Sequence, residues 1–198
     1  MFSLVIAAPE PIRARSRGQK LPGMLATAAS LRVQSSWDVE TTTTVIALRS
    51  LARRFRTLNT QAKEHEKTIR AIIRSWRPDL LEEFDVGAIV AATVLCAWSH
   101  PGRIHSEAAF AMLAGVAPIP ANSGQVTNRY RLNRYGDRQL NRALHVIVQS
   151  RIHYDDPTRA YVARRTTESK TSREIKRYLS RYIARDLYRL LENGPIKA

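Results

Sequence analysis

The 198-residue sequence has little of what several classes of protein need. It holds a single cysteine, Cys96, which excludes an internal disulfide and fits a reducing cytoplasm. No apolar stretch approaches the ~18 residues that a membrane span requires. The apolar segment Met1–Ala8 has no basic residues before it and ends at Pro9, which is unlike a signal peptide. These absences predict a soluble, cytoplasmic protein with no membrane partner.

Patterns for bound metals and nucleotides are missing as well. The five histidines show no paired metal-ligand spacing, and a lone cysteine cannot complete a zinc site. The sequence has neither a phosphate-cradling glycine loop of the nucleotide hydrolases nor a Ser-His-Asp pattern. We therefore expect this chain alone to bind no metal or other cofactor.

Acidic residues are scarce relative to basic ones. The chain has 32 Lys and Arg residues against 17 Asp and Glu residues, a formal net charge of +15. The excess is uneven, because residues 123–198 hold 17 basic and 7 acidic residues, a net charge of +10. So large an excess favours a polyanionic partner, of which nucleic acid is the commonest. The last part of the chain is the expected electrostatic contact.

The residues that are present show mostly helical patterns. Residues 1–40 are rich in proline, glycine and basic residues with little periodicity, which predicts a poorly ordered lead-in with a short helix near Met24–Leu31. In residues 41–76, apolar positions alternate by three and four, as in a coiled-coil seam. The seam consists of Leu48, Leu51, Phe55, Leu58, Ala62, His65, Ile69, Ile72 and Trp76. Such a stripe must be buried against its own domain or against a second chain.

Residues 77–198 are predicted to form a compact helical domain. Pro78 can open a first helix, and the turn Asp85–Val86–Gly87 leads to a second helix that ends near Trp98. This is the layout of a helix-hairpin-helix element, in which Gly87 would let backbone amides approach a phosphate oxygen. An ordinary helical hairpin that packs into the core fits the same residues, so both interpretations stay open.

The stretch from Ser106 to Arg142 has the chemistry on which the prediction of function depends. It begins with a short apolar helix that Ser106 can cap and Gly115 ends, followed by a loop that contains Ser123–Gly124. Covalent attack on a phosphodiester needs a hydroxyl nucleophile on a rigid turn beside cations, and Ser123 fits that demand. A plain nucleic-acid-binding loop would have the same residues.

Arginines follow the serine loop in two patterns. Arg129, Arg131 and Arg134 alternate with aromatic and apolar residues, which suits contact with a nucleic-acid backbone together with base stacking. The alternative is a solvated loop whose tyrosines are anchored in the core. Asp137 is then placed to cap a helix from which Arg138 and Arg142 face outward. The expected nucleic-acid-binding residues are Gly87, Arg129, Arg131, Arg134, Arg138 and Arg142.

The last long helix completes the predicted domain. Thr171 and Glu174 form a capping box at its start, and Asn193–Gly194 ends it. Its polar face is almost entirely basic, and we expect some of these residues to meet phosphate: Arg173, Lys176, Arg177, Arg181, Arg185 and Arg189. The predicted fold is all-α: a poorly ordered lead-in (1–40), a coiled-coil helix (41–76) and a compact helical domain with a helix-hairpin-helix element (77–198).

The run LAGVAPIP…SGQ…RLNRYGDRQLNRAL resembles the carboxy-terminal domain of insertion-sequence transposases of the family numbered one hundred and ten, the bridge-RNA-guided recombinases. A weaker likeness extends from about Leu21 to Asn193. The resemblance implies a recombinase that cuts and rejoins DNA at element ends and targets, guided by a structured RNA, with the serine before glycine as nucleophile. Relatives often have two adjacent serines here; Asn122 stands in the first place, so the role falls to Ser123. Pairing of relatives through such a helix implies a homo-oligomer.

The same resemblance exposes a departure. The family carries an amino-terminal RuvC-like half in which four carboxylates hold magnesium, whereas the acidic residues before Thr41 are only Glu10, Asp38 and Glu40. The sequence therefore predicts a transposase fragment that binds nucleic acid but does not recombine alone. The alternative function is a non-catalytic nucleic-acid-binding protein that makes no use of Ser123. An RNA-only binder is a third possibility.

Overall fold

The computed structural model describes residues 2–120, 130–133 and 135–194. Ser123, Arg129 and Arg134 lie outside the described residues. The chain is all-α, as predicted, and the strands in the described part are confined to one short antiparallel pair. It divides into two compact units, residues 1–65 and 66–198. In the part of the chain that the structure describes, no helix is both long and apolar enough to cross a membrane.

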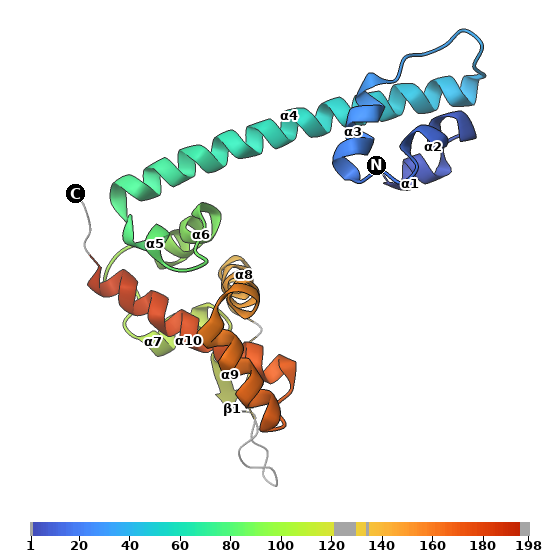
Figure 1. The fold of residues 1–198 in the computed structure, drawn as a ribbon. Coiled ribbons are helices and arrows are strands. Elements are labelled where there is room, and N and C mark those ends of the chain that lie inside the picture. The colour runs from blue at the N-terminus through green and yellow to red at the C-terminus, as the bar shows by residue number, and fades with distance from the viewer. Residues whose placement is uncertain (1, 121–129, 134, 195–198) are drawn as a thin grey trace. The chain divides into compact units, whose positions relative to one another are not determined.

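The first unit contains three short helices, α1 (Phe2–Ala7), α2 (Glu10–Ser16) and α3 (Leu21–Ser30), beside the amino-terminal part of α4 (Val39–Trp76) (Figure 1). This differs from the poorly ordered lead-in predicted for residues 1–40. Each short helix has too few turns to show a period, yet each buries one or two apolar side chains in a shared cluster. The cluster consists of Val5, Ala8, Ile12, Leu25, Ala28, Leu31, Val45, Leu48 and Ala52.

Helix α4 has 38 residues and covers the predicted coiled-coil segment. Only part of its predicted seam is buried: Leu48 is inside, whereas Leu51, Phe55 and Leu58 are 39%, 44% and 53% exposed. Near the end of the helix, the second unit takes Ile73 into its core, and the predicted seam residue Ile72 is 59% exposed. The stripe of Leu51, Phe55 and Leu58 is thus left exposed by the described helices of the first unit.

The second unit contains α5 (Asp79–Glu82), α6 (Ala88–Trp98), α7 (Glu107–Leu113), α8 (Arg138–Tyr154), α9 (Asp156–Thr167) and α10 (Ser172–Asn193). Helices α7, α8 and α9 pack on α10, and α6 packs on α8 (Figure 1). The large apolar side chains buried at their centre include Leu80, Trp98, Phe110, Leu140, Leu144, Ile147, Ile175 and Leu191. Strands β1 (Pro118–Pro120) and β2 (Tyr130–Leu132) form the antiparallel pair.

The helix caps predicted from the sequence are confirmed. Ser106 accepts a hydrogen bond from the Ala109 amide at 3.1 Å, and Asp137 accepts from the first amides of α8 at 2.7 and 3.0 Å. Thr171 and Glu174 form both bonds of a capping box at the start of α10. Capping depends on residues three apart in the chain, so a local pattern is enough to predict it.

Arg77 is a buried residue that the sequence analysis did not select. Its side chain is fully buried, donates to the carbonyls of Leu190 and Leu191 at 2.9 and 3.2 Å, and pairs with Asp79 at 2.6 Å. Its guanidinium also lies 5.7 Å from the centre of the Trp98 ring. The carbonyls at a helix end have no intrahelical partner, so Arg77 caps the end of α10 and joins it to the end of α4.

Candidate nucleic-acid interface

Strands β1 and β2 hold the two ends of the segment that contains Ser123. Their register pairs Pro118 with Leu132 and Pro120 with Tyr130. The residues that flank 121–129, Pro120 and Tyr130, are therefore neighbours across the strand pair. Arg131 lies on β2 opposite Ile119. The strand pair therefore fixes the positions of the two residues that flank 121–129.

Gly115, before β1, and Gly136, after β2, lie in contact, and we call this region, together with the end of α7, the foot of the strand pair. Gly115 has a φ of +66°, the left-handed conformation that ends α7, as the sequence predicted. A Cβ atom on Gly136 would lie 2.5 Å from the Gly115 backbone nitrogen, closer than real Cβ contacts. No side chain fits at Gly136, because the backbone before α8 runs directly against the backbone after α7.

Three hydrogen bonds, two from asparagine side chains and one from a backbone amide, hold the foot to the end of α7. The Asn133 side chain donates to the carbonyl of residue 112 at 2.9 Å, and the Asn141 side chain donates to that of residue 114 at 2.8 Å. The Asp137 amide donates to the carbonyl between them at 2.6 Å. All three bonds satisfy carbonyls at the end of α7 that have no partner within the helix. Sequence reasoning missed both asparagines; the only signal was their position around Gly136 in LNRYGDRQLN.

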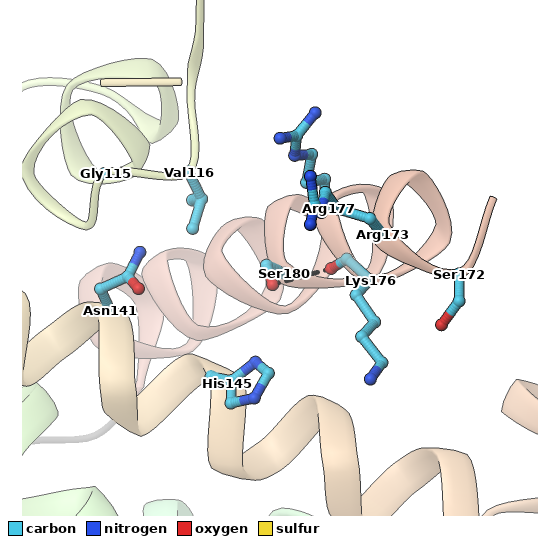
Figure 2. Close-up of a pocket in the computed structure, with 9 residues that line it drawn as sticks. All are labelled: Gly115, Val116, Asn141, His145, Ser172, Arg173, Lys176, Arg177 and Ser180. Atoms are coloured by element: carbon cyan, nitrogen blue, oxygen red, sulfur yellow. Dashed lines mark hydrogen bonds between the residues drawn. The ribbon is translucent and has the colours of Figure 1, made fainter. Parts of the chain in front are cut away.

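The basic pocket lies beside this foot and has a volume of ≈610 Å³ (Figure 2). It is bounded by the chain after α7, by α8 and by the first half of α10. Its lining residues are Gly115, Val116, Asn141, His145, Ser172, Arg173, Lys176, Arg177 and Ser180. Figure 2 shows the Lys176 side chain extending from α10 toward α8, where Asn141 and His145 lie. None of the described residues that line the pocket carries a carboxylate.

The structure divides the six basic residues of α10 into two groups. Arg181 and Arg189 both donate to Glu107, at 3.2 Å and 2.6 Å, and Arg185 lies 3.6 Å from Asp186. The three that line the pocket, Arg173, Lys176 and Arg177, form no side-chain hydrogen bond or ion pair with another described residue. The first group stabilises the fold, and the second group is available to a ligand.

The nearest carboxylate on α10 is already engaged. Glu174 accepts from the Thr171 amide and hydroxyl, each at 2.8 Å. The bond from the Thr171 amide is the main cause that holds the pKa of Glu174 below its ordinary value, and Lys170 and Arg177 contribute through their charge. Glu174 therefore stays ionised and bound to the helix cap.

Two of the predicted site residues, Arg138 and Arg142, lie beside the pocket on α8. Both are exposed, and neither pairs with another described residue. Helical spacing places them in the row next to Asn141 and His145. Tyr135 is 96% exposed, so the alternative in which it anchors the loop in the core is wrong for that residue. Arg138 and Arg142 thus extend the positive charge of the pocket along α8.

Gly87 lies elsewhere. It is the residue before α6, with a φ of −75°, and nothing lies within 4 Å of a Cβ built on it. The turn before it packs on the far end of α8, where Ser150 donates to Asp85 at 2.6 Å. Ser150 is twelve residues beyond Arg138 on α8, which separates them by roughly 18 Å. The structure does not bring Gly87 together with the arginines, and its phosphate contact stays a prediction.

The helix-hairpin-helix interpretation also stays a prediction. The first helix of the expected pair, α5, has only four residues, and Glu82, Glu83 and Asp85 precede Gly87. These carboxylates would repel a phosphate that approached the start of α6. Within residues 2–120, 130–133 and 135–194, no group of three or more His, Cys, Asp and Glu side chains could hold a metal ion. The described residues therefore do not fit a magnesium site.

Part of the second unit is similar to a known family of proteins. Residues 80–163 match the family model of the IS116/IS110/IS902 transposases. The match runs from α5 into α9 and includes Ser123, the Gly115–Gly136 contact and Arg138. It ends before α10, so three of the pocket's cations lie outside the matched range.

Curated proteins of insertion elements are similar over more of the chain. An uncharacterized 43.6 kDa protein of insertion element IS110 from Streptomyces coelicolor is 28% identical over 151 residues. An uncharacterized 42 kDa protein of insertion element IS900 from Mycobacterium paratuberculosis is 28% identical over 156 residues. These alignments cover 75% and 77% of this chain but 37% and 39% of the relatives. The chain thus spans less than two fifths of the length of either relative.

Proposed function

We propose that this chain is the serine-bearing part of a DNA transposase that cuts and rejoins DNA through Ser123. The observation that supports this most is the family match over residues 80–163, a range that includes Ser123 and Arg138. The transposase family acts on DNA, and the +15 charge of the chain suits a DNA partner. Element ends and target sites are the proposed substrates.

The proposed step exchanges one phosphate ester for another. The Ser123 oxygen forms a bond to phosphorus while a bond from phosphorus to a sugar oxygen breaks. The leaving sugar oxygen takes up a proton and becomes a hydroxyl, and the serine proton passes to solvent or a base. A hydroxyl of another strand then attacks the phosphorus and gives up its proton while the bond from phosphorus to the Ser123 oxygen breaks. The serine oxygen takes up a proton, and a phosphodiester is restored. No external energy source is needed, because the number of phosphate esters is unchanged.

The chain's own part in this step is to bind and orient the strand. Charge builds up on the phosphoryl oxygens during attack, so guanidinium groups close to the phosphate lower the barrier. We propose Arg138 and Arg142 for backbone contacts, with Arg129, Arg131 and Arg134 as further contacts from the loop and β2. When bound, magnesium would polarise the phosphate. Because the described residues do not fit such a site, we assign the carboxylates to a RuvC-like part outside these 198 residues.

Two further partners belong to the proposal. A structured guide RNA would select the DNA, as the resemblance implies. Self-association would cover the stripe of Leu51, Phe55 and Leu58, which lies outside the buried cluster of the first unit. Burial of such a stripe against a second copy is the usual reason that a helix has one.

A covalent-adduct assay tests the role of Ser123. The purified chain is incubated with DNA that carries the element ends, the RNA transcribed beside the gene and magnesium, with and without the metal-binding half of a relative. We expect a denaturation-resistant protein–DNA band only when that half is added, and we expect Ser123→Ala to abolish it. A band that persists in Ser123→Ala would remove the serine from the mechanism.

The second candidate is a non-catalytic nucleic-acid-binding protein. The unpaired cations of α8 and α10 support it, because they can hold a strand without any use of Ser123. Salt-sensitive binding is expected of both candidates. Retained binding with no adduct under every condition, including the added metal-binding half, would favour this candidate. A preference for RNA over element DNA would instead indicate an RNA binder.

A further inference from the structure

We propose that the basic pocket binds one phosphodiester group of a nucleic-acid strand and that Lys176 is its main charge contact. The proposal rests on the proposed function in that it assumes a nucleic-acid ligand. It applies equally to the catalytic and the non-catalytic candidate, because it concerns binding alone. It adds a site on α10, beyond the matched range of residues 80–163.

The composition of the pocket selects an anion. Arg173, Lys176 and Arg177 supply positive charge, Asn141 and His145 supply polar nitrogen atoms, and no lining residue is acidic. Guanidinium and ammonium groups bind phosphate oxygens through short, charge-assisted hydrogen bonds. A neutral ligand of the same size would leave these cations without a hydrogen-bond acceptor in the pocket.

The cations in the pocket also repel one another. Arg173 is three residues from Lys176 and four from Arg177, so all three lie on one face of α10. Like charges at these spacings destabilise a helix by about 0.2–0.5 kcal/mol per pair. On the same helix, Arg189 pairs with the Glu107 carboxylate and Arg181 donates to the Glu107 backbone carbonyl, so the helix does not leave its cations without partners along its whole length. A phosphate in the pocket would relieve the repulsion among Arg173, Lys176 and Arg177 in the first half of α10.

The position of the pocket fits a strand that passes the serine loop. Gly115 and Val116 line the pocket, and the chain continues from Val116 directly into β1. Strand β1 pairs with β2, and together they hold both ends of residues 121–129. A strand with one phosphate in the pocket therefore runs along the foot of the segment that contains Ser123.

Lysine protection tests the contact in the unmodified chain. The full chain is treated with an amine-acetylating reagent, alone and with a single-stranded DNA or an RNA oligonucleotide of the same sequence. Peptide mass spectrometry then gives the acetylation rate of each lysine. We expect the nucleic acid to slow acetylation of Lys176 about tenfold and to change Lys170 little, because Lys170 lies before α10 and outside the pocket.

A matched pair of variants tests the energy of the contact. Lys176→Gln and Lys170→Gln make the same chemical change six residues apart. We expect Lys176→Gln to weaken binding of the oligonucleotide about tenfold at low salt and Lys170→Gln less than about twofold. The slope of log K against log salt should fall by about 0.7 for Lys176→Gln on single strands. Circular dichroism and thermal unfolding confirm that both variants fold.

The outcomes separate the proposal from its alternatives. Protection of Lys176 by both oligonucleotides supports a phosphodiester contact common to DNA and RNA, and protection by one of them names the source. Equal protection of the two lysines, or equal loss of affinity in the two variants, would overturn the proposal. None of these readouts needs strand cleavage. A failed adduct assay with selective Lys176 protection would therefore reject the catalytic candidate and keep the pocket.

Discussion

The apolar stripe of α4 and the apolar face of α10 have similar sequence patterns but different surroundings. Leu51, Phe55 and Leu58 are largely exposed, whereas Ile175, Leu187 and their neighbours on α10 are almost fully buried. The helices α7, α8 and α9 pack against α10, while no described element covers the middle of α4. Apolar residues spaced three and four positions apart therefore predict that a helix face is buried, but they do not predict which element buries it. In α10 the partner is the chain itself, and for α4 we propose a second copy.

A charge placed in the exposed stripe of α4 tests whether a second copy of the chain covers it. Phe55→Glu should weaken self-association about 100-fold, because a carboxylate in an apolar interface costs about 3 kcal/mol. Thr57→Glu introduces the same residue two positions away, off the stripe, and should leave the assembly intact. Sedimentation velocity over a range of concentrations measures both. A wild-type chain that is monomeric throughout would contradict the proposed pairing.

The packing of α10 within its own unit is tested through Arg77, which caps the end of that helix. Arg77→Met should lower the free energy of unfolding by about 3–5 kcal/mol, because it leaves Asp79 and two helix carbonyls without their buried partner. Arg74→Met removes an exposed arginine near the end of α4 and should change little. Urea unfolding monitored by circular dichroism gives both values. Equal effects of the two substitutions would mean that the Arg77 network contributes nothing.

The close contact of Gly115 with Gly136 predicts a smaller effect within the second unit. Gly136→Ser should destabilise it by about 2–3 kcal/mol, since its Cβ would collide with the Gly115 backbone. Gly87→Ser is the matched control, because Gly87 has open space and serine is favoured before a helix. Thermal unfolding distinguishes them. If Gly136→Ser were as stable as Gly87→Ser, the backbones could not be in close contact.

The smallest expected effect concerns pH. The pKa of Glu174 is lowered in the folded chain by its bond to the Thr171 amide, so its contribution to stability is present above its unfolded value near 4.5. That contribution is lost as the pH falls through the lower folded value, because the unfolded state then binds more protons. Glu174→Gln keeps the shape of the cap without titrating. The stability difference between wild type and Glu174→Gln should therefore shift against wild type on acidification and stay constant above pH 6.

The accuracy of the sequence predictions follows the range of the interactions involved. The caps at Ser106, Asp137 and Thr171 were predicted correctly because each needs only its own next three residues. In the lead-in, the helix expected near Met24–Leu31 is confirmed as α3, but α1 and α2 were missed, because they pack on Val45 and Leu48, which come later in the chain. Asn133 and Asn141 were missed for the same reason, since their partners are carbonyls about twenty or more residues earlier.

The sequence by itself determined the all-α fold, the ends of several helices and the basic excess toward the carboxyl end. These features depend on composition and on spacings of a few residues, which the linear chain states directly. Only the tertiary structure decided which cations pair within the fold and which line the basic pocket. Arg189 and Lys176 are indistinguishable in the pattern of α10, but Glu107 lies against the first and the chain after Gly115 lies near the second. Helices distant in the sequence place these neighbours, so the role of each charge depends on packing.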